Sequence, residues 1–271
     1  MLRDRLITAV IAIPLLIWVI FWGPSWVYNL VVFSATFVAL REFAAMACHG
    51  VSHQTTMITL GGMTIAFAMG FGATGIWISA ALVTCLAGVL VGTLATARDM
   101  QRSVGAAGHI LLGCLYGGLL LPHFIWVRKL PGGAGWVCFV IACVMAGDAG
   151  GYFGGRFFGR RPLWPAVSPK KTWEGATAAF LCTLLMGAVV NVIVLQAMGP
   201  FEVLLVSGTV SILAQLGDLL ESMLKRAYDA KDSGWIFPGH GGVLDRTDSL
   251  VLPIVFVYYY AILGHGVVTR L

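Results

Sequence analysis

Long apolar stretches follow one another along nearly the whole chain, separated by short polar segments. A helix needs roughly 20 apolar residues to cross the hydrocarbon core of a bilayer, and nine stretches approach that length. The pattern therefore predicts an all-α polytopic membrane protein with about nine transmembrane helices. The expected spans are residues 6–22, 26–47, 55–71, 75–95, 104–127, 134–155, 173–197, 201–225 and 248–268.

The composition supports this prediction. Hydrophobic residues make up 59% of the chain and charged residues 11%, with a mean hydropathy of +0.89, which lies outside the range of soluble globular domains. The first apolar run lacks a small-residue cleavage site, so we expect it to be retained as a span. All six cysteines lie in apolar stretches and none forms a CxxC pair, which favours buried, reduced thiols.

The basic residues predict the orientation, because Lys and Arg accumulate on the cytoplasmic side of membrane proteins. With a cytoplasmic N-terminus, the nine spans place all but three of the 17 basic residues in the cytoplasm. The exceptions are Arg128, Lys129 and Arg270. This orientation puts two polar loops, residues 156–172 and 226–247, on the same side, so we expect an active site at the cytoplasmic face. We divide the chain into an N-terminal scaffold, residues 1–130, and a catalytic region, residues 131–271.

Carboxylates are concentrated between Asp218 and Asp248, a segment that holds six of the twelve acidic residues of the chain. Residues three and four apart share one face of a helix, so the eighth span is expected to carry a polar stripe at its cytoplasmic end. A second helix start, around Asp245 and Asp248, has the same spacing. The stripe consists of Gln215, Asp218, Glu221, Ser222 and Lys225.

Two interpretations of these carboxylates stay open. Carboxylates near the membrane core are costly and normally face a cavity, a partner or an ion. Asp218 and Asp245 are suited to bind Mg²⁺, which prefers oxygen ligands, with Asp248 and Glu221 in supporting roles. The alternative is internal ion pairing, for example of Asp229 with Lys225 or Arg226.

The loops themselves favour phosphate binding. Glycines 239, 241 and 242 flank His240 and allow the backbone to approach a ligand closely. The other loop follows Asp148 and leads to the expected start of the seventh span near Thr172, where free N–H groups and a positive helix end attract anions. Carboxylates among so many cations point to metal-assisted phosphate chemistry. The cations of this loop are Arg156, Arg160, Arg161, Lys170 and Lys171.

The segment SMLKRAYDAKDSGWIFPGHGGVLDRTDS, residues 222–249, resembles the signature of the phosphatidate cytidylyltransferase (CDP-diacylglycerol synthase) family. Similar stretches surround Tyr152 and Arg156, residues 168–175 and residues 215–221, so the close match covers residues 148–249. Gly151 departs from the family, where alanine commonly precedes the tyrosine. The matching signature positions are Ser222, Lys225, Arg226, Lys231, Asp232, Pro238, His240, Gly241, Gly242, Asp245, Arg246 and Asp248.

This resemblance implies transfer of a cytidylyl group from CTP to phosphatidic acid, giving CDP-diacylglycerol and pyrophosphate for phospholipid biosynthesis. It implies Mg²⁺ as cofactor, with one or two ions left open, a homodimer, no nucleic-acid partner and a place in the bacterial inner membrane. We expect the metal ligands to be Asp218 and Asp245. The expected catalytic residues are Asp148, Glu221, Ser222, His240 and Asp248. The expected phosphate- and substrate-binding residues are Arg156, Ser168, Lys170, Lys171, Lys225, Arg226, Lys231, Gly241, Gly242 and Arg246.

Three other functions compete with this one. A transporter also carries intramembrane carboxylates, but it usually shows inverted repeats and midplane charges, which this sequence lacks. CDP-alcohol phosphotransferases resemble one another through a DGxxAR stretch, and this chain contains no Asp-Gly dipeptide. A membrane-bound lipid kinase would transfer a γ-phosphate instead, which product analysis distinguishes.

Overall fold

The computed structural model describes residues 14–72, 74–234 and 241–264. The chain forms two compact units. Unit 1 contains residues 1–126, 228–245 and 269–271, and unit 2 contains residues 127–227 and 246–268. The polar segment 228–245 therefore folds together with the N-terminal helices. Each unit is described by itself below.

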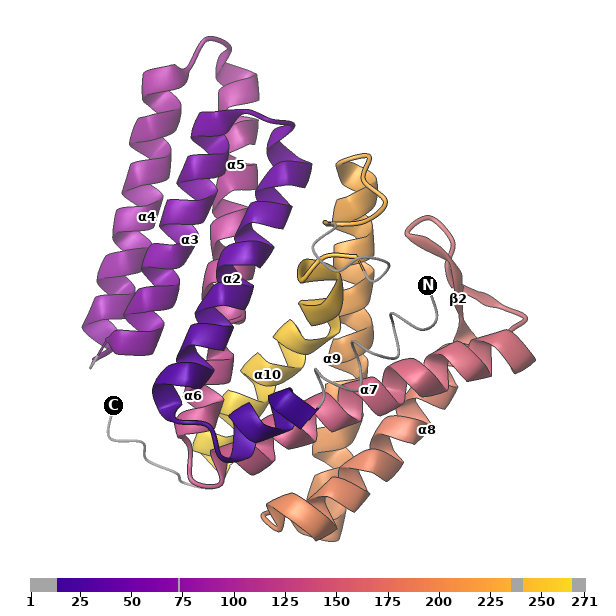
Figure 1. Cartoon of the computed structure of the whole chain (residues 1–271). Helices are drawn as coiled ribbons and strands as arrows, with labels where there is room; N and C mark the ends of the chain where they lie inside the picture. The colour runs from indigo at the N-terminus through magenta and orange to yellow at the C-terminus, as the bar shows by residue number, and fades with distance from the viewer. Residues whose placement is uncertain (1–13, 73, 235–240, 265–271) are drawn as a thin grey trace. The chain divides into compact units, whose positions relative to one another are not determined.

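Unit 1 is a group of helices that pack side by side (Figure 1). Glycines allow α2 to approach α5 and the following turn η1 closely: a side chain at Gly113 of α5 would collide with Phe43, and one at Gly117 of η1 would collide with Leu40. Tyr228 begins the polar segment and packs edge-on against Phe43 and His109. Burial raises the pKa of the Tyr228 hydroxyl. The helices of this unit are α2 (Ser25–Cys48), α3 (Ser52–Phe71), α4 (Gly75–Thr96), α5 (Met100–Leu115) and the π-helical turn η1 (Tyr116–Leu120).

Unit 2 is built on a tight contact between α7 (Gly133–Phe158) and α8 (Trp173–Val190). A Cβ atom at Gly147 would meet Thr183, and one at Gly154 would meet Ala178, so the glycines of α7 bring the two backbones together. A hairpin of β1 (Pro162–Trp164) and β2 (Ser168–Thr172) connects them. The remaining elements are η2 (Asn191–Leu195), α9 (Pro200–Ala227) and α10 (Leu244–Gly264), which begins in unit 1, while α6 (His123–Lys129) joins the units.

The helical prediction is confirmed, and seven helices of the described residues are long and apolar enough to cross a membrane. Two of the nine expected spans are not among them. The first lies in part outside the described residues, and its described part is helical from residue 14 to 21. The third corresponds to α3, which has 20 residues. The hairpin was not predicted, because its strands are only three and five residues long. The seven helices are Ser25–Cys48, Gly75–Thr96, Met100–Lys129, Gly133–Phe158, Trp173–Leu195, Pro200–Ala227 and Leu244–Gly264.

Candidate active site

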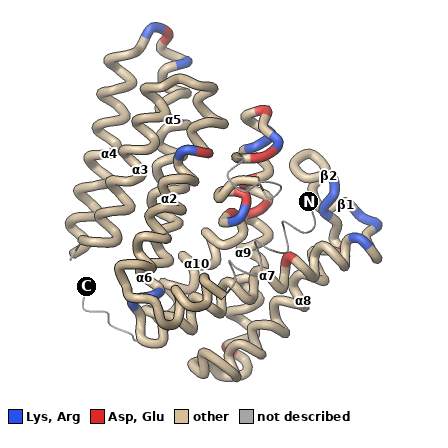
Figure 2. Tube along the Cα trace, viewed as in Figure 1, with Lys and Arg blue, Asp and Glu red and all other residues tan. Residues whose placement is uncertain are grey.

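The C-terminal half of α9 carries the polar stripe that the sequence predicts. Nζ of Lys225 lies 2.9 Å from Oε2 of Glu221, one helical turn away. Gln215, at the other end of the stripe, donates from Nε2 to Oγ of Ser211 over 3.3 Å. Figure 2 shows the charged residues gathered at this end of α9 and on the hairpin. Thus two members of the stripe, Gln215 and Lys225, interact with polar groups one turn away on α9.

Glu221 and Asp248 bring α9 and α10 together at the centre of this charged region. Their side chains are 1% and 6% exposed and lie close enough to interact. Oδ1 of Asp248 accepts hydrogen bonds from the amide and the hydroxyl group of Ser249, at 2.7 and 3.2 Å. Oε1 of Glu221 is buried and receives no hydrogen bond. Two acidic side chains are therefore buried together, and Oε1 of Glu221 is an acceptor that no hydrogen bond uses.

The close approach of these two helices depends on Gly217, which immediately precedes Asp218. A Cβ atom at Gly217 would collide with the backbone carbonyl group of Asp248. Only glycine lets the two backbones meet at this distance. The residue next to an expected metal ligand thus has a structural role that the sequence analysis did not assign.

Asp148, in the C-terminal half of α7, belongs to a third helix of the same region. Its carboxylate interacts electrostatically with Asp218 and Asp248 and with the cations Lys171 and Arg246. Three carboxylates and two cations from four elements of unit 2 therefore share one electrostatic environment. This arrangement unites residues that the sequence analysis assigned to catalysis, to the metal and to phosphate binding.

Lys171 enters this region from strand β2, where its Nζ lies 2.5 Å from Oδ2 of Asp218. The strand is held in place at its end, because Thr172 caps α8 by accepting a hydrogen bond from the amide of Gly175 over 3.1 Å. Glu174 accepts hydrogen bonds from the amides of Arg160 and Arg161 at 3.0 and 3.2 Å. The expected helix start is confirmed at Trp173, and the cap and the glutamate fix the hairpin that carries Lys171.

The other expected residues of unit 2 lie on the same helices and on the hairpin. Arg156 lies in the last turn of α7 and donates to the hydroxyl group of Tyr152 over 2.8 Å. Lys170 is exposed on β2, next to Lys171. Ser168 begins β2, and Ser222 and Arg226 lie on α9.

The expected residues of unit 1 form a compact turn around Asp245. Its Oδ2 accepts hydrogen bonds from the amides of Ser233 and Gly242, at 3.0 and 2.9 Å. Gly241 adopts a φ of +78°, a left-handed conformation that favours glycine. Lys231 is exposed, and His240 lies outside the described residues. Asp218 and Asp245 belong to different units, so their pairing on one metal ion stays a prediction.

Comparison with known proteins shows the family to which this chain belongs. The model of the cytidylyltransferase family matches residues 3–263, nearly the whole chain. This chain belongs to the cytidylyltransferase family. A phosphatidate cytidylyltransferase of Staphylococcus haemolyticus (strain JCSC1435) is 30% identical over 263 residues, which cover 94% of this chain and 97% of the relative.

Two further relatives in the family match a shorter region. The phosphatidate cytidylyltransferase of Bacillus subtilis (strain 168) is 39% identical over 153 residues, 56% of this chain and 57% of the relative. That of Mycobacterium bovis (strain ATCC BAA-935 / AF2122/97) is 34% identical over 153 residues, 56% of this chain and 47% of the relative. In these two alignments the chain spans about half the length of the relatives it matches.

One buried acidic residue of this family member was missed by the sequence analysis. Glu42 on α2 is 5% exposed and accepts hydrogen bonds from the amides of Val243 and Leu244, at 3.0 and 2.8 Å. A carboxylate inside an apolar span was a signal in itself, because such residues are functional candidates by default. Its partners, about 200 residues away in the sequence, could not be predicted from spacing.

The donor chemistry of unit 2 suits a hard divalent cation. Mg²⁺ takes oxygen ligands, usually one or two carboxylates together with phosphate and water oxygens, and Asp148, Asp218 and Asp248 supply carboxylates to one region. Within the described residues, no three His, Cys, Asp or Glu side chains already converge as metal ligands. The ligand atoms available, carboxylate oxygens, are therefore of the type that Mg²⁺ prefers, and phosphate or water oxygens would complete its coordination.

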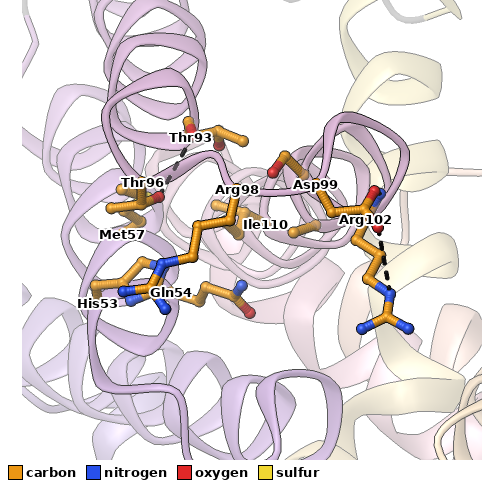
Figure 3. A pocket seen from close by; sticks show the side chains of 11 residues that line it. His53, Gln54, Met57, Thr93, Thr96, Arg98, Asp99, Arg102 and Ile110 are labelled. Carbon is orange, nitrogen blue, oxygen red and sulfur yellow. Dashed lines mark hydrogen bonds and ion pairs between the residues drawn. The ribbon is translucent and has the colours of Figure 1, made fainter.

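A separate pocket of about 250 Å³ in unit 1 is lined by the ends of α3, α4 and α5 (Figure 3). Arg98 extends across it toward His53 and Gln54, while Arg102 pairs with Asp99 over 3.8 Å. None of the expected site residues lines this pocket.

Proposed function

We propose that this protein transfers the cytidylyl group of CTP to phosphatidic acid, giving CDP-diacylglycerol and pyrophosphate. The observation that carries the proposal is the ion pair between Lys171 and Asp218 within a cluster of carboxylates and cations. The chain that contains this cluster belongs to the cytidylyltransferase family. The curated relatives that it resembles are named phosphatidate cytidylyltransferases. The apolar helices support a site beside the bilayer, where a lipid substrate would meet a nucleotide from water.

The reaction needs charge neutralisation more than a general base. A phosphomonoester has a second pKa of about 6, so phosphatidate is mostly dianionic at pH 7 and already nucleophilic. One of its oxygens attacks the α-phosphorus of CTP, and the bond from that phosphorus to the β-phosphate bridging oxygen breaks, releasing pyrophosphate. The barrier arises largely from repulsion between the two anions, which fixed cations and precise positioning lower.

The residues of unit 2 supply both effects. Lys171 and Arg246 would provide positive charge for phosphate oxygens. Lys225 of α9, which forms an ion pair with Glu221, is the third cation. Asp218 and Asp245 are the proposed ligands of Mg²⁺, and Asp148 and Asp248 add negative charge to the region of Asp218. When bound, the ion would neutralise charge on the phosphates as a Lewis acid. We assign Arg156, Ser168, Lys170 and Arg226 to the approach of the anionic substrates.

We further propose nine spans, a cytoplasmic N-terminus, and a site at the cytoplasmic face of a bacterial inner membrane, with the protein acting as a homodimer. The basic residues support the orientation through their predicted distribution. The resemblance to phosphatidate cytidylyltransferases supports the dimer. Cysteine accessibility labelling of the two polar loops in intact cells tests the orientation, and the mass of the purified protein in detergent tests the dimer.

Product analysis tests the proposed reaction. Purified protein is incubated with Mg²⁺, CTP labelled in the cytosine ring, and vesicles containing phosphatidic acid. We expect the label to enter the lipid fraction in equal amount to the pyrophosphate released. Label from the γ-phosphate in the lipid would instead identify a lipid kinase, and the absence of labelled lipid in either experiment would refute the proposal.

A further inference from the structure

Glu42 is a buried carboxylate in the last turns of α2, inside a helix that otherwise consists mainly of apolar residues. A carboxylate in this setting is costly unless hydrogen bonds or opposite charges compensate it. Its compensation comes from a distant part of the same unit, the described residues 233–234 and 242–244 of the polar segment. This contact joins the N-terminal helices to the polar segment that carries the family signature.

Three donors from this segment surround the carboxylate. Oε1 of Glu42 accepts from the amide of Val243, and Oε2 accepts from the amide of Leu244 and from Oγ of Ser233 at 3.4 Å. The two amides stand at the start of α10, where backbone N–H groups lack partners within the helix and attract negative charge. Glu42 of α2 therefore caps the N-terminus of α10.

The same contacts lead to Asp245. Oγ of Ser233, which donates to Glu42, accepts from the amide of Asp245 over 3.3 Å. The amide of Ser233 in turn donates to the Asp245 carboxylate. Ser233 therefore connects the Glu42 carboxylate to Asp245, an expected metal ligand, through hydrogen bonds on both sides.

The segment is also shaped around the carboxylate. A Cβ atom at Gly234 or at Gly242 would collide with the carboxylate of Glu42. Glycine at these two positions gives the carboxylate the space in which it receives its hydrogen bonds. The position of Glu42 and the course of the backbone at both glycines are therefore mutually dependent.

We propose that Glu42 is a positioning residue that fixes the segment around Asp245 in its active geometry. It touches neither substrate nor metal, and it acts by holding the amides of Val243 and Leu244 and, through Ser233, the orientation of Asp245. The inference rests on the proposed function, and it gives the N-terminal helices a part in catalysis beyond that of a scaffold.

The test compares Glu42→Gln, Glu42→Asp and the control Asp99→Asn with the wild type in detergent. Asp99 is a matched control because it caps α5 of the same unit by accepting from the amide of Arg102 over 3.0 Å. Hydrogen exchange of the peptide containing Val243 and Leu244, measured without metal or nucleotide, reports on the segment directly. Steady-state kinetics with CTP and phosphatidic acid reports on its consequence, and thermal unfolding reports on the fold.

In Glu42→Gln an amide NH₂ group replaces one acceptor oxygen and faces an N–H donor. We expect exchange in this peptide to become about 10- to 100-fold faster and kcat/KM to fall by a similar factor, the range for hydrogen bonds to charged groups. Glu42→Asp, which keeps the charge on a shorter side chain, should lie between Glu42→Gln and the wild type. Asp99→Asn should leave both readouts at the wild-type level.

Unchanged exchange together with unchanged kcat/KM in Glu42→Gln would overturn the inference. A loss of thermal stability with wild-type exchange in this peptide would also overturn it, because Glu42 would then support only the general fold. If Glu42→Gln fails to fold, Glu42→Asp decides by the same two readouts. An inactive wild type refutes the proposed reaction instead, so the two failures are distinguishable.

Discussion

Nζ of Lys171 lies 2.5 Å from Oδ2 of Asp218, which joins the hairpin to the charged face of α9. Both side chains are partly exposed, at 27% and 34%, so each is accessible to an incoming ligand. In the sequence analysis one residue was expected to bind phosphate and the other metal. Their ion pair places the two expected functions at one point, where a phosphate could bridge between a cation and a metal ion.

The first prediction concerns the cation of this pair. Lys171→Ala removes the positive charge beside Asp218, and we expect kcat/KM for CTP to fall about 10- to 100-fold. Lys170→Ala is the matched comparison, because neighbouring residues of a strand point to opposite faces, and its loss should be smaller. Steady-state kinetics of both variants checks this. Equal losses in the two variants would show that the hairpin contributes only a general positive field.

The second prediction concerns the contact between α9 and α10. Gly217→Ala inserts a methyl group against the carbonyl of Asp248, and overpacking of this kind typically costs about 1–3 kcal/mol. We expect a lower unfolding temperature in detergent, together with lower activity, because Asp218 and Asp248 move apart. Gly88→Ala is the control, since a side chain there meets open space. A Gly217→Ala protein with wild-type stability and activity would contradict the described packing.

The third prediction uses the collision between Gly234 and Glu42. Gly234→Ala alone should lower kcat/KM, because the new methyl group displaces the Glu42 carboxylate. In a Glu42→Ala background the carboxylate is absent, so the same substitution should have little additional effect. Residues in contact commonly show interaction energies of about 0.5–3 kcal/mol in such a cycle. Kinetics of the four proteins measures this coupling, and strictly additive losses would exclude it.

The fourth prediction concerns the divalent ion. Chelation should abolish activity, because the phosphates of both substrates would repel each other without a bridging cation. Added Mg²⁺ should restore activity, and the helical circular dichroism should stay constant throughout, since the fold consists of apolar helices. Full activity of chelator-treated protein would refute the role of the ion.

The sequence predicted the helices and the charged face of α9 because both depend on local periodicity. Apolar length predicted nine spans, and seven helices of the described residues are long and apolar enough to cross a membrane. Spacings of three and four residues placed Glu221 and Lys225 on one face. The spacing of the acidic residues and the ligand preference of Mg²⁺ drew attention to Asp218 and Asp245, although neither could indicate that Lys171 pairs with Asp218.

Other features depend on contacts that no local pattern records. The roles of Glu42 and Gly217 arise from backbone groups of the polar segment and of α10, far away in the sequence. The hairpin is too short for a periodic signal, and it is held by the cap at Thr172 and the carboxylate of Glu174. A lone glutamate in an apolar span was visible, but the identity of its partners required the folded chain.

The most direct test of the account is the rate of CTP-dependent pyrophosphate release with phosphatidic acid, compared between the wild type and Asp218→Asn. We expect the wild type to release pyrophosphate as CDP-diacylglycerol forms. The variant should fold with a similar unfolding temperature and lose about 100-fold or more in rate, as for removal of a key electrostatic group from an active site. A folded Asp218→Asn protein with near wild-type turnover would contradict the central role of the carboxylate cluster.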